Sequence, residues 1–341
     1  EANAWSTFAY LEGEIASAKG EIDLTKMTFE YKMEDAEIWS PIAAINENKK
    51  FKATLTGLIP DRNYCYRLVY KNGSEDYASE PTYFITETQN KIPNLKFDDW
   101  YSTGKKATYY PCKESDYGSK FWDSGNEGSN TLSSINPTSM ESTDVVAGNA
   151  AKLSSKIVDA GIMKVFAAGS IYTGDFIKAV VSLTNPGAQL SFGQPFTERP
   201  TQLTGYYKYN PGKVDNTSEK VPNVKSGDRD HCSIYIALTD WSTPFLANTQ
   251  TSTFIDFTDT SIIAYGELSS DMTAPESMSN YEKFTIDLKY RSLTRKPTHI
   301  LIVCSSSQYG DYFVGSSNSV LLIDEFDFIY GEPTVDPNYI K

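Results

Sequence analysis

The feature that most constrains the fold is a series of short segments in which strongly apolar residues occur at every second position. The stretch DHCSIYIALTDW, residues 230–241, is the clearest of them, with its apolar set running from Cys232 to Leu238. Successive side chains of a β-strand point to opposite faces, so this period places that set on one face and Ser233 and Tyr235 on the other. The pattern predicts a strand with one face on a hydrophobic core.

The same stretch contains one of the two histidines and one of the four cysteines, which raises the question of a metal site. His231 and Cys232 are neighbours, so in a strand they point to opposite faces and cannot ligate one ion. The cysteines show no CxxC pair. We therefore expect no metal, no cofactor and buried free thiols. The sequence leaves a disulfide between Cys232 and Cys304 open.

Residues 1–90 are predicted to form one β-rich unit. The segments STFAYLEGEI, MTFEYKMEDA and FKATLTGL alternate, and polar turns separate them. The segment LIPDRNY, residues 58–64, resembles the tyrosine corner of fibronectin type III and related immunoglobulin-like domains. In that motif the tyrosine hydroxyl bonds back to the backbone upstream, and Tyr64 is the matching residue. We expect an immunoglobulin-like sandwich that serves as a spacer.

A polar segment with a proline, TETQNKIPN at residues 86–94, separates this unit from a second one. The second unit has about eight strand-like segments and no amphipathic helix of three turns, which suits a jelly roll. We therefore predict an all-β chain with three parts. They are an immunoglobulin-like β-sandwich at residues 1–90, a larger β-sandwich jelly roll at residues 91–332 and a tail at residues 333–341.

Charge and hydropathy exclude several classes of partner. The chain has 31 basic and 44 acidic residues, a net charge of −13. Nucleic-acid binding draws its affinity from Lys and Arg on phosphates, so we expect no nucleic-acid partner. No apolar run approaches the roughly 20 residues that a bilayer span needs, so we expect no transmembrane segment. The start at Glu1, without Met, fits either a removed signal peptide or a trimmed chain.

Two further segments point to a ligand. HILIVC, residues 299–304, has apolar residues at both odd and even positions, which predicts a central strand covered on both faces. It leads into the polar loop SSSQYGDY, where a ligand could bind. In the strand-like segment QLTGYYKYN, residues 202–210, Tyr206 and Lys208 are two positions apart and therefore point to the same face. If that strand lies beside Tyr235, one sheet presents a polar, aromatic face, and aromatic rings offer flat apolar surface to sugar C–H groups. A solvated sheet face explains the same residues equally well.

Carboxylates are the only candidates for catalysis. Glycoside hydrolysis needs two of them across the scissile bond, roughly 5 to 9 Å apart. Glu267, Glu325, Asp240 and Asp311 are candidates, but a chain with 44 acidic residues always offers pairs. The chain has no GxSxG or HExxH motif, and His299 opens an apolar strand and is expected to be structural.

Several long motifs carry a family resemblance. They are GQPFTERPTQLTGYYKYNPG, DHCSIYIALTDW, IAYGEL, YRSLTRKPTHILIVCSSSQYGDYF and LLIDEFDFIY. Together they resemble the putative carbohydrate metabolism domain of cell-envelope proteins in polysaccharide-using Gram-negative bacteria, over roughly residues 97–330. The resemblance implies a jelly roll similar to those of glycoside hydrolases and carbohydrate-binding modules, with a sugar pocket. It implies a secreted, cell-surface or periplasmic protein, with room for a lipid anchor upstream. It assigns no catalytic residue.

We therefore predict a carbohydrate-active envelope protein that binds a glycan in the second unit and acts as a monomer. Trp100 is expected to stack on a sugar ring, and Arg199 and Lys208 to bond its hydroxyls. Glu267 and Glu325 are the candidate catalytic acid and base. The other predicted contacts are Tyr172, Tyr206, Tyr235, Arg291, Ser306, Tyr309 and Asp311.

Three questions stay open at this stage. The sequence does not tell whether the glycan is only bound or also hydrolysed, nor which sugar it is. A structural or adhesive surface protein without sugar chemistry is the alternative function. Oxygen ligands for calcium could come from DSGNEGSN at residues 123–130, but loop solvation explains that segment equally well.

Overall fold

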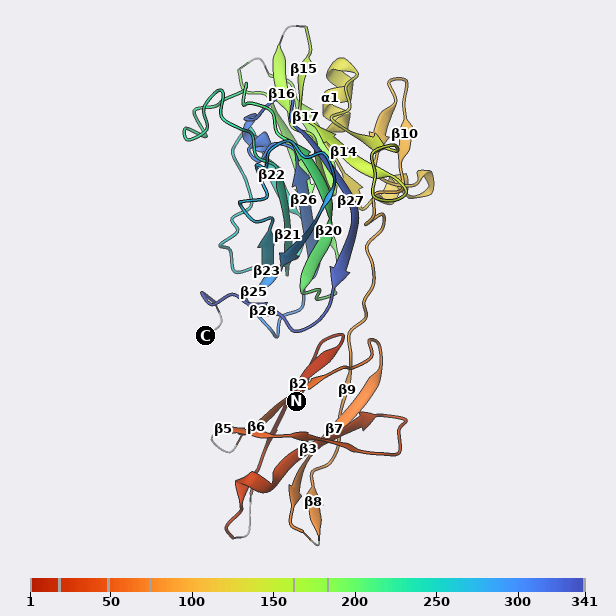
Figure 1. Cartoon of the computed structure of the whole chain (residues 1–341), viewed down its shortest axis with the longest axis vertical. Coiled ribbons are helices and arrows are strands. Elements are labelled where there is room, and N and C mark those ends of the chain that lie inside the picture. The colour runs from red at the N-terminus through yellow and green to blue at the C-terminus, as the bar shows by residue number, and fades with distance from the viewer. Residues whose placement is uncertain are drawn as a thin grey trace. The chain divides into compact units, whose positions relative to one another are not determined.

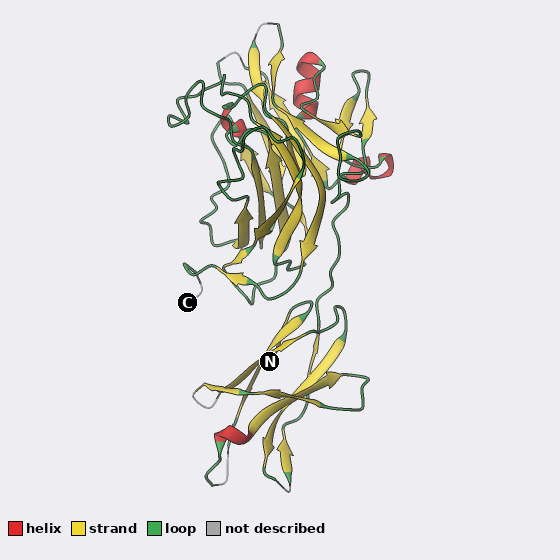
Figure 2. Cartoon of the chain, in the orientation of Figure 1, coloured by secondary structure: helices red, strands yellow, loops and turns green. Residues whose placement is uncertain are grey.

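The computed structural model describes residues 2–17, 20–47, 50–73, 75–161, 163–182 and 184–339. The chain divides into two compact units, residues 1–90 with 330–332 and residues 91–329 with 333–341. Strands dominate both units, as Figure 2 shows in yellow. The predicted all-β sandwich fold is confirmed. The identities given to residues 1–90, 91–332 and 333–341 stay predictions.

The first unit is built from two antiparallel sheets. One has the order β1 (Ala2–Ala4), β2 (Phe8–Glu14), β6 (Lys50–Thr56), β5 (Ile45–Glu47). The other has the order β4 (Ser40–Ala43), β3 (Met27–Met33), β7 (Asn63–Lys71), β8 (Asp76–Ala78), with β9 (Thr82–Ile85) also on β7. A short 3₁₀ turn, η1 (Leu24–Lys26), precedes β3.

The core of the first unit explains why its strands alternate. Leu11, Phe29 and Phe51 are fully buried in one cluster. The tyrosine-corner prediction is confirmed in its geometry, because the backbone N–H of Ile59 donates to the Tyr64 hydroxyl oxygen over 3.1 Å. That bond ties the start of β7 to the chain that leads into it.

The second unit is built around a large sheet (Figure 1). Its order is β22 (Phe245–Asn248), β18 (Gly187–Phe192), β17 (Ser170–Val180), β26 (His299–Ser305), β21 (Ser233–Thr239), β23 (Ile262–Glu267), β25 (Lys289–Tyr290), β28 (Thr334–Val335). Two short strands join its sides, β12 (Trp122–Asp123) on β17 and β19 (Gln194–Pro195) on β26. The prediction that residues 299–304 form a central strand buried on both faces is confirmed, because β26 pairs with β17 and β21 and is almost wholly buried.

A smaller sheet faces the large one. Its order is β13 (Thr138–Glu141), β14 (Ala150–Ser154), β27 (Val320–Ile329), β20 (Gln202–Asn210), β24 (Glu282–Asp287). From the large sheet, Ile234, Ile236 and Ile302 are at most 1% exposed, and from the small sheet Phe284 and Phe326 are equally buried. The period-two pattern of residues 232–238 thus reflects a core face, as expected.

β27 departs from the simple alternation. Opposite β20 its register shifts between the pairs Thr204–Asp327 and Tyr206–Asp324, which marks a β-bulge, and Glu325 sits there with φ of 50°. The extra residue puts Ile323 and Phe326 on the core face and turns Asp324 away from it. Asp324 is still buried, and its carboxylate accepts a hydrogen bond from the backbone N–H of Val146 over 2.7 Å.

Smaller elements stand at one end of the large sheet. They are the hairpins β10 (Tyr101–Thr103) with β11 (Thr108–Tyr110) and β15 (Lys156–Asp159) with β16 (Lys164–Ala167), the helix α1 (Asn126–Ser133) and the 3₁₀ turns η2 (Glu114–Ser119) and η3 (Gly310–Tyr312). Within the described ranges, no helix has the length and apolar character that crossing a bilayer requires. All four cysteines are buried free thiols, so the disulfide left open between Cys232 and Cys304 is not formed.

Candidate functional site

A cavity of about 180 Å³ lies against the face of the large sheet that points away from the small sheet. Its floor comes from three neighbouring strands, β17, β26 and β21. The register sets Ser170, Ser305 and Ser233 side by side in one row. The next row on the same face is Tyr172, Val303 and Tyr235. The residues between these rows, such as Ile171 and Ile234, point into the core and are at most 1% exposed.

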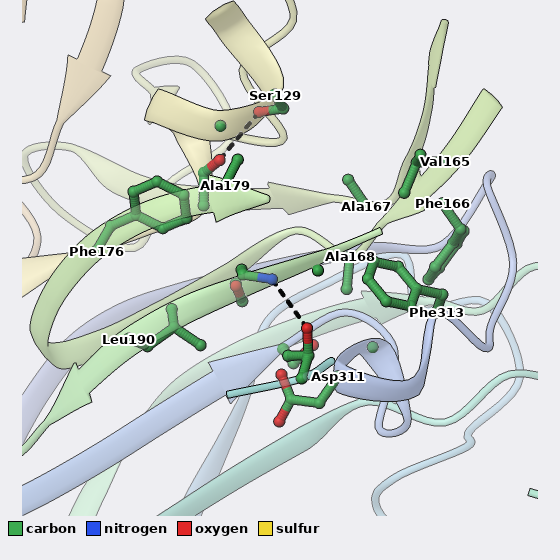
Figure 3. Close-up of a pocket in the computed structure, with 18 of the residues that line it drawn as sticks. Ser129, Val165, Phe166, Ala167, Ala168, Phe176, Ala179, Leu190, Asp311 and Phe313 are labelled. Atoms are coloured by element: carbon green, nitrogen blue, oxygen red, sulfur yellow. Dashed lines mark hydrogen bonds between the residues drawn. The ribbon is translucent and has the colours of Figure 1, made fainter. Parts of the chain in front are cut away.

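Apolar side chains form most of the wall. Figure 3 shows Phe176 and Leu190 on one side of the space and Phe166 and Phe313 on the other, with Asp311 below. The helix α1 closes another side, and it can approach because Gly128 has no side chain: a Cβ there would lie 3.0 Å from the ring of Phe176. The wall therefore draws on segments that are far apart in the sequence.

The Asp311 carboxylate is the one acidic group among the residues that line this cavity. It makes no hydrogen bond or ion pair with the residues that the structure describes. The residue has exposed surface, yet protein surrounds the recess into which it opens, and this poor solvation raises the pKa of Asp311 to about 6. A carboxylate without a partner in a recess is available to a ligand.

The charge of Asp311 interacts with both tyrosines of the cavity floor, Tyr172 and Tyr235. Desolvation is the main reason that the pKa of Tyr172 and that of Tyr235 are well above the usual value. The negative charges of Asp123, Asp175 and Asp311 add to it at Tyr172, and that of Asp311 adds to it at Tyr235. The Tyr172 hydroxyl is also buried without a hydrogen-bond partner among the described residues. Leaving such a group unpaired costs about 1–3 kcal/mol.

The loop that presents Asp311 is held by a buried network. Asp230 accepts hydrogen bonds from Ser307 Oγ over 2.6 Å, Ser319 Oγ over 2.8 Å and the Ser316 backbone N–H over 2.8 Å. Desolvation outweighs these bonds and raises the pKa of Asp230. Gly310 fits tightly beside the hairpin, because a Cβ there would lie 2.5 Å from the Cβ of Ala168. The Asp230 network and the close packing of Gly310 against Ala168 therefore hold the loop that carries Asp311 in place.

A second, more polar hollow of about 290 Å³ shares part of its lining with the first. We call it the vestibule. Its own polar residues are Lys164, Asn185, Asn216, Thr217, Ser218 and Lys220. Both spaces are lined by Val165, Phe166, Pro186, Thr249, Asp311 and Phe313. Asp311 thus belongs to the apolar cavity and to the polar vestibule.

The two predicted catalytic residues do not line either space, and they lie on different sheets. Glu267 ends β23 of the large sheet and accepts a hydrogen bond from the Tyr265 hydroxyl over 2.7 Å. Glu325 lies in β27 of the small sheet and pairs with Lys96 over 2.6 Å. A third candidate carboxylate, Asp240, pairs with Arg295. The structure brings none of these carboxylates into the lining with Asp311.

Three predicted sugar contacts also lie outside the cavity lining. The pairing that would bring β20 beside the strand that holds Tyr235 does not occur, because β20 pairs with β24 and β27 in the small sheet. Tyr206 and Lys208 therefore do not join Tyr235, and Lys208 pairs with Asp144 over 2.7 Å. Trp100 is half-buried and donates its indole N–H to the Phe97 carbonyl over 2.7 Å.

The predicted arginines serve other contacts. Arg199 is 2% exposed and donates to the Leu293 carbonyl over 2.8 Å. Arg291 donates to the Phe257 carbonyl over 2.6 Å and lies 4.5 Å from the ring centre of Tyr339. Both arginines stand outside the two linings.

Two predicted contacts neighbour the cavity without lining it. Ser306 is fully buried, with its hydroxyl 2.8 Å from that of Ser155, whereas Tyr309 is 37% exposed in the Asp311 loop. Of the predicted contacts, the structure brings together Tyr172, Tyr235 and Asp311.

Sequence reasoning missed the serine row and the apolar wall. A signal for the row was available, because the tripeptide Ser-Ile-Tyr occurs at residues 170–172 and again at residues 233–235. In a strand, Ser and Tyr of that tripeptide share one face and Ile takes the other. The two copies flank β26 and point the same way, so they form the floor together.

The segment where calcium was left open is largely helical. Residues 126–133 form α1 rather than a loop, and the Asp123 carboxylate accepts the Phe176 backbone N–H over 2.8 Å. Burial raises the pKa of Asp123 to about 6 even though Lys120 lies 3.2 Å away. Among the described residues, no group of three or more His, Cys, Asp and Glu side chains is arranged to hold an ion.

Comparisons with known proteins agree with this architecture. A family model described as a putative carbohydrate metabolism domain matches residues 96–329. A crystal structure of a putative glycoside hydrolase from Bacteroides thetaiotaomicron is 19% identical, with a TM-score of 0.52, and the alignment covers 92% of this chain and 100% of that one. A second putative glycoside hydrolase, from Bacteroides vulgatus, is 20% identical, with a TM-score of 0.50, over 69% of this chain and 96% of that one. At these identities the likeness concerns the fold. A comparison with curated proteins gave no match.

Proposed function

Because the chain belongs to the putative carbohydrate metabolism domain family, we propose that residues 91–332 bind a glycan at the cavity on the large sheet. A carbohydrate-related role follows from the family. The cavity as the binding site, and binding as the activity, are the steps that the proposal adds. In it, the rings of Tyr172 and Tyr235 contact the C–H groups of the ligand, and Asp311 accepts its hydroxyls.

The observation that carries the proposal is the Asp311 carboxylate. It has no partner among the described residues and lines a shaped recess together with Tyr172 and Tyr235. A sugar hydroxyl can donate a hydrogen bond to a free carboxylate. Ligand sites in proteins are typically apolar recesses with a few converging polar groups, and this recess has that composition.

Binding is favoured over hydrolysis by the number of carboxylates. Hydrolysis in most glycoside hydrolase families uses two carboxyl groups, one of them an acid with a raised pKa. Asp311 has the raised pKa of an acid, about 6, but it is the one carboxyl in the lining. The predicted pair, Glu267 and Glu325, lies on two different sheets. We therefore propose a binding protein rather than a hydrolase.

The proposal includes a secreted or cell-surface location and a monomeric protein, because a polysaccharide is met outside the cytoplasm and one cavity suffices to bind it. The similar crystal structures come from Bacteroides, a genus named in both of them. Fractionation of cells that produce the full-length protein tests the location. Recovery in the soluble cytoplasmic fraction alone would contradict it.

The function is tested by a glycan panel with the whole chain and two variants. Asp311→Asn removes the carboxylate of the cavity. Asp271→Asn is the matched control, since it removes one negative charge at an exposed residue outside both linings. We expect one or more glycans to bind, Asp311→Asn to weaken binding by about tenfold or more, and Asp271→Asn to leave it unchanged, because hydrogen bonds to charged groups contribute about 1.5–3 kcal/mol. Binding of no glycan, or equal binding by both variants, overturns the proposal.

A further inference from the structure

We propose that the ligand is a carbohydrate that carries an aliphatic substituent, an alkyl or acyl chain, and that this substituent fills the apolar cavity while the sugar lies in the vestibule. This inference rests on the proposed function and names its substrate class. It follows from the different linings of the two adjoining spaces, since the cavity is mainly apolar and the vestibule mainly polar.

Beyond its floor, the cavity has polar side chains at Ser129, Thr249, Ser307, Gln308 and Asp311, and the rest of its lining is apolar. Its wall consists largely of aliphatic and aromatic side chains, of which Figure 3 shows Val165, Ala167, Phe176, Ala179 and Leu190. Val158, Val180, Ala188 and Phe192 extend the same lining. None of these side chains can form a hydrogen bond, so hydroxyls placed against them would lose their water without replacement.

Energetics decide between the two occupants. Burying a hydroxyl without a hydrogen-bond partner is unfavourable. Each methylene group buried from water contributes about 0.8 kcal/mol, which increases the affinity about fourfold. A free sugar has a hydroxyl on almost every carbon, and an alkyl chain has none. The wall therefore selects a chain, and it disfavours an unsubstituted sugar ring at full depth.

The vestibule has the opposite character. Lys164, Lys220, Asn185 and Asn216 line it, and they supply donors and acceptors for hydroxyls. Lys220 Nζ already lies 3.1 Å from Ser252 Oγ, so its ammonium group is held in place at the rim. A sugar in this space keeps its polar partners and its contact with water.

Asp311 lies where the two spaces meet, since it lines both together with Phe313. The 3₁₀ turn η3 places it there, and the left-handed conformation of Phe313, with φ of 60°, ends that turn. A carboxylate at the junction can accept a hydroxyl of the sugar next to its substituted position. The same group repels an anionic chain end, so the part of the ligand that enters the cavity is an uncharged chain attached to a sugar, not a free fatty acid.

The test measures the affinity of the full chain for paired glycosides by isothermal titration calorimetry. Methyl and n-octyl β-glycosides of glucose, galactose, mannose and N-acetylglucosamine form the pairs, and n-octanol is the chain without a sugar. All octyl compounds are kept below their micelle concentrations. We expect an octyl glycoside to bind at least a hundredfold more tightly than its methyl partner and than n-octanol, since several methylenes become buried.

Variants locate the chain in the cavity. Val165→Asp places a charge in the wall, and Val181→Asp does so at a more exposed position of the same lining, in case the first variant fails to fold. Leu246→Asp is the matched control, because Leu246 is exposed like Val181 and lies outside both linings. We expect the two lining variants to reduce the octyl preference at least tenfold and the control to keep it.

The outcomes separate this inference from the proposed function. Equal binding of methyl and octyl glycosides overturns the inference and leaves glycan binding standing. Binding of n-octanol as tight as that of octyl glycosides overturns both, because the sugar then contributes nothing. An octyl preference that survives Val165→Asp and Val181→Asp places the chain elsewhere and overturns the inference. No binding of any probe overturns it too, while the glycan panel still decides the proposed function.

Discussion

The two faces of β17, β26 and β21 are built from alternate residues of the same strands, yet only one of them contributes to the lining of the cavity. On the face toward the small sheet, Ile171, Ile234 and Cys304 are at most 1% exposed and meet other core residues. On the opposite face, the residues next to them in sequence, Tyr172 and Tyr235, floor a cavity. Alternation thus lets one strand serve the core with one set of side chains and a ligand with the other.

This difference teaches that stability and binding can be changed separately within two adjacent residues. Core side chains contribute through burial and packing, and their loss leaves a void. Tyr235 on the cavity face is only partly buried, so its loss removes ligand contacts and leaves most of the packing intact. The predictions below break or sharpen that separation, from the largest expected effect to the smallest.

The largest effect is expected on the core face. Ile234→Ala should lower the free energy of unfolding by about 2–5 kcal/mol, because it empties space in a core that cannot fully collapse. Chemical denaturation measures the loss, and glycan affinity of the folded fraction should stay within about twofold of the wild type. A variant that keeps its stability and loses its affinity would break the separation of the two faces.

On the cavity face, Tyr235→Ala should weaken glycan binding by roughly 30-fold, since central aromatic contacts typically contribute 2 kcal/mol or more. The comparison variant is Tyr309→Ala, which removes an aromatic residue of the Asp311 loop that lies outside the lining. Its affinity should be unchanged. Calorimetric titration with the best glycan of the panel checks both variants, and equal losses would show that the ligand contacts the loop rather than the floor.

The pH dependence of binding should follow Asp311. The pKa of its carboxyl in the folded protein is about 6, so a bond that needs the carboxylate is present above pH 6. Below pH 6, affinity should fall up to about tenfold per pH unit, and Asp311→Asn should show a flat profile between pH 5 and pH 8. Titration across that range is the measurement, and a wild-type profile as flat as that of the variant would contradict the role.

The free energy of unfolding should depend on pH in the direction opposite to that of glycan binding. The pKa of Asp311 rises from about 3.9 in the unfolded chain to about 6 in the folded one, so the folded protein binds this proton more tightly. Its contribution is therefore full below pH 4 and is lost as the pH rises through 6. Asp123 has a raised pKa as well and adds the same trend. The difference between wild type and Asp311→Asn in thermal unfolding isolates the Asp311 part.

The smallest effect is expected in the network behind the loop. Ser307→Ala removes the donor that lies 2.6 Å from the Asp230 carboxylate, and it should cost about 1–3 kcal/mol of stability because a buried acceptor loses a partner. Ser317→Ala is the control, because the Ser317 hydroxyl donates to the carboxylate of Asp215 and this hydrogen bond is exposed to solvent. Chemical denaturation should find less than about 1 kcal/mol for the control, and equal values would remove the case for the buried network.

The sequence predicted the features that depend on local alternation. The core face of residues 232–238, the central position of residues 299–304 and the bond made by Tyr64 follow from period and turn chemistry, and the structure has each of them. Those features need no knowledge of which strands pair.

Features that depend on long-range pairing could not be predicted. Alternation leaves open whether Tyr206 and Lys208 lie beside Tyr235, and only the structure shows that β20 joins the other sheet. At Glu325 a bulge breaks the alternation, so parity counted across it fails. The helix α1, NEGSNTLS, is rich in poor helix formers, and its close packing through Gly128 against Phe176 is tertiary information. The cavity wall likewise joins segments from α1 to η3.

A crystal structure of the protein with the best-binding glycan of the panel tests the central claim most directly. The account predicts ligand density on the large sheet, against Tyr172 and Tyr235, with a sugar hydroxyl within hydrogen-bond distance of an Asp311 oxygen. Density on the small sheet beside Lys208, or at Trp100, with the cavity free of ligand, would contradict it.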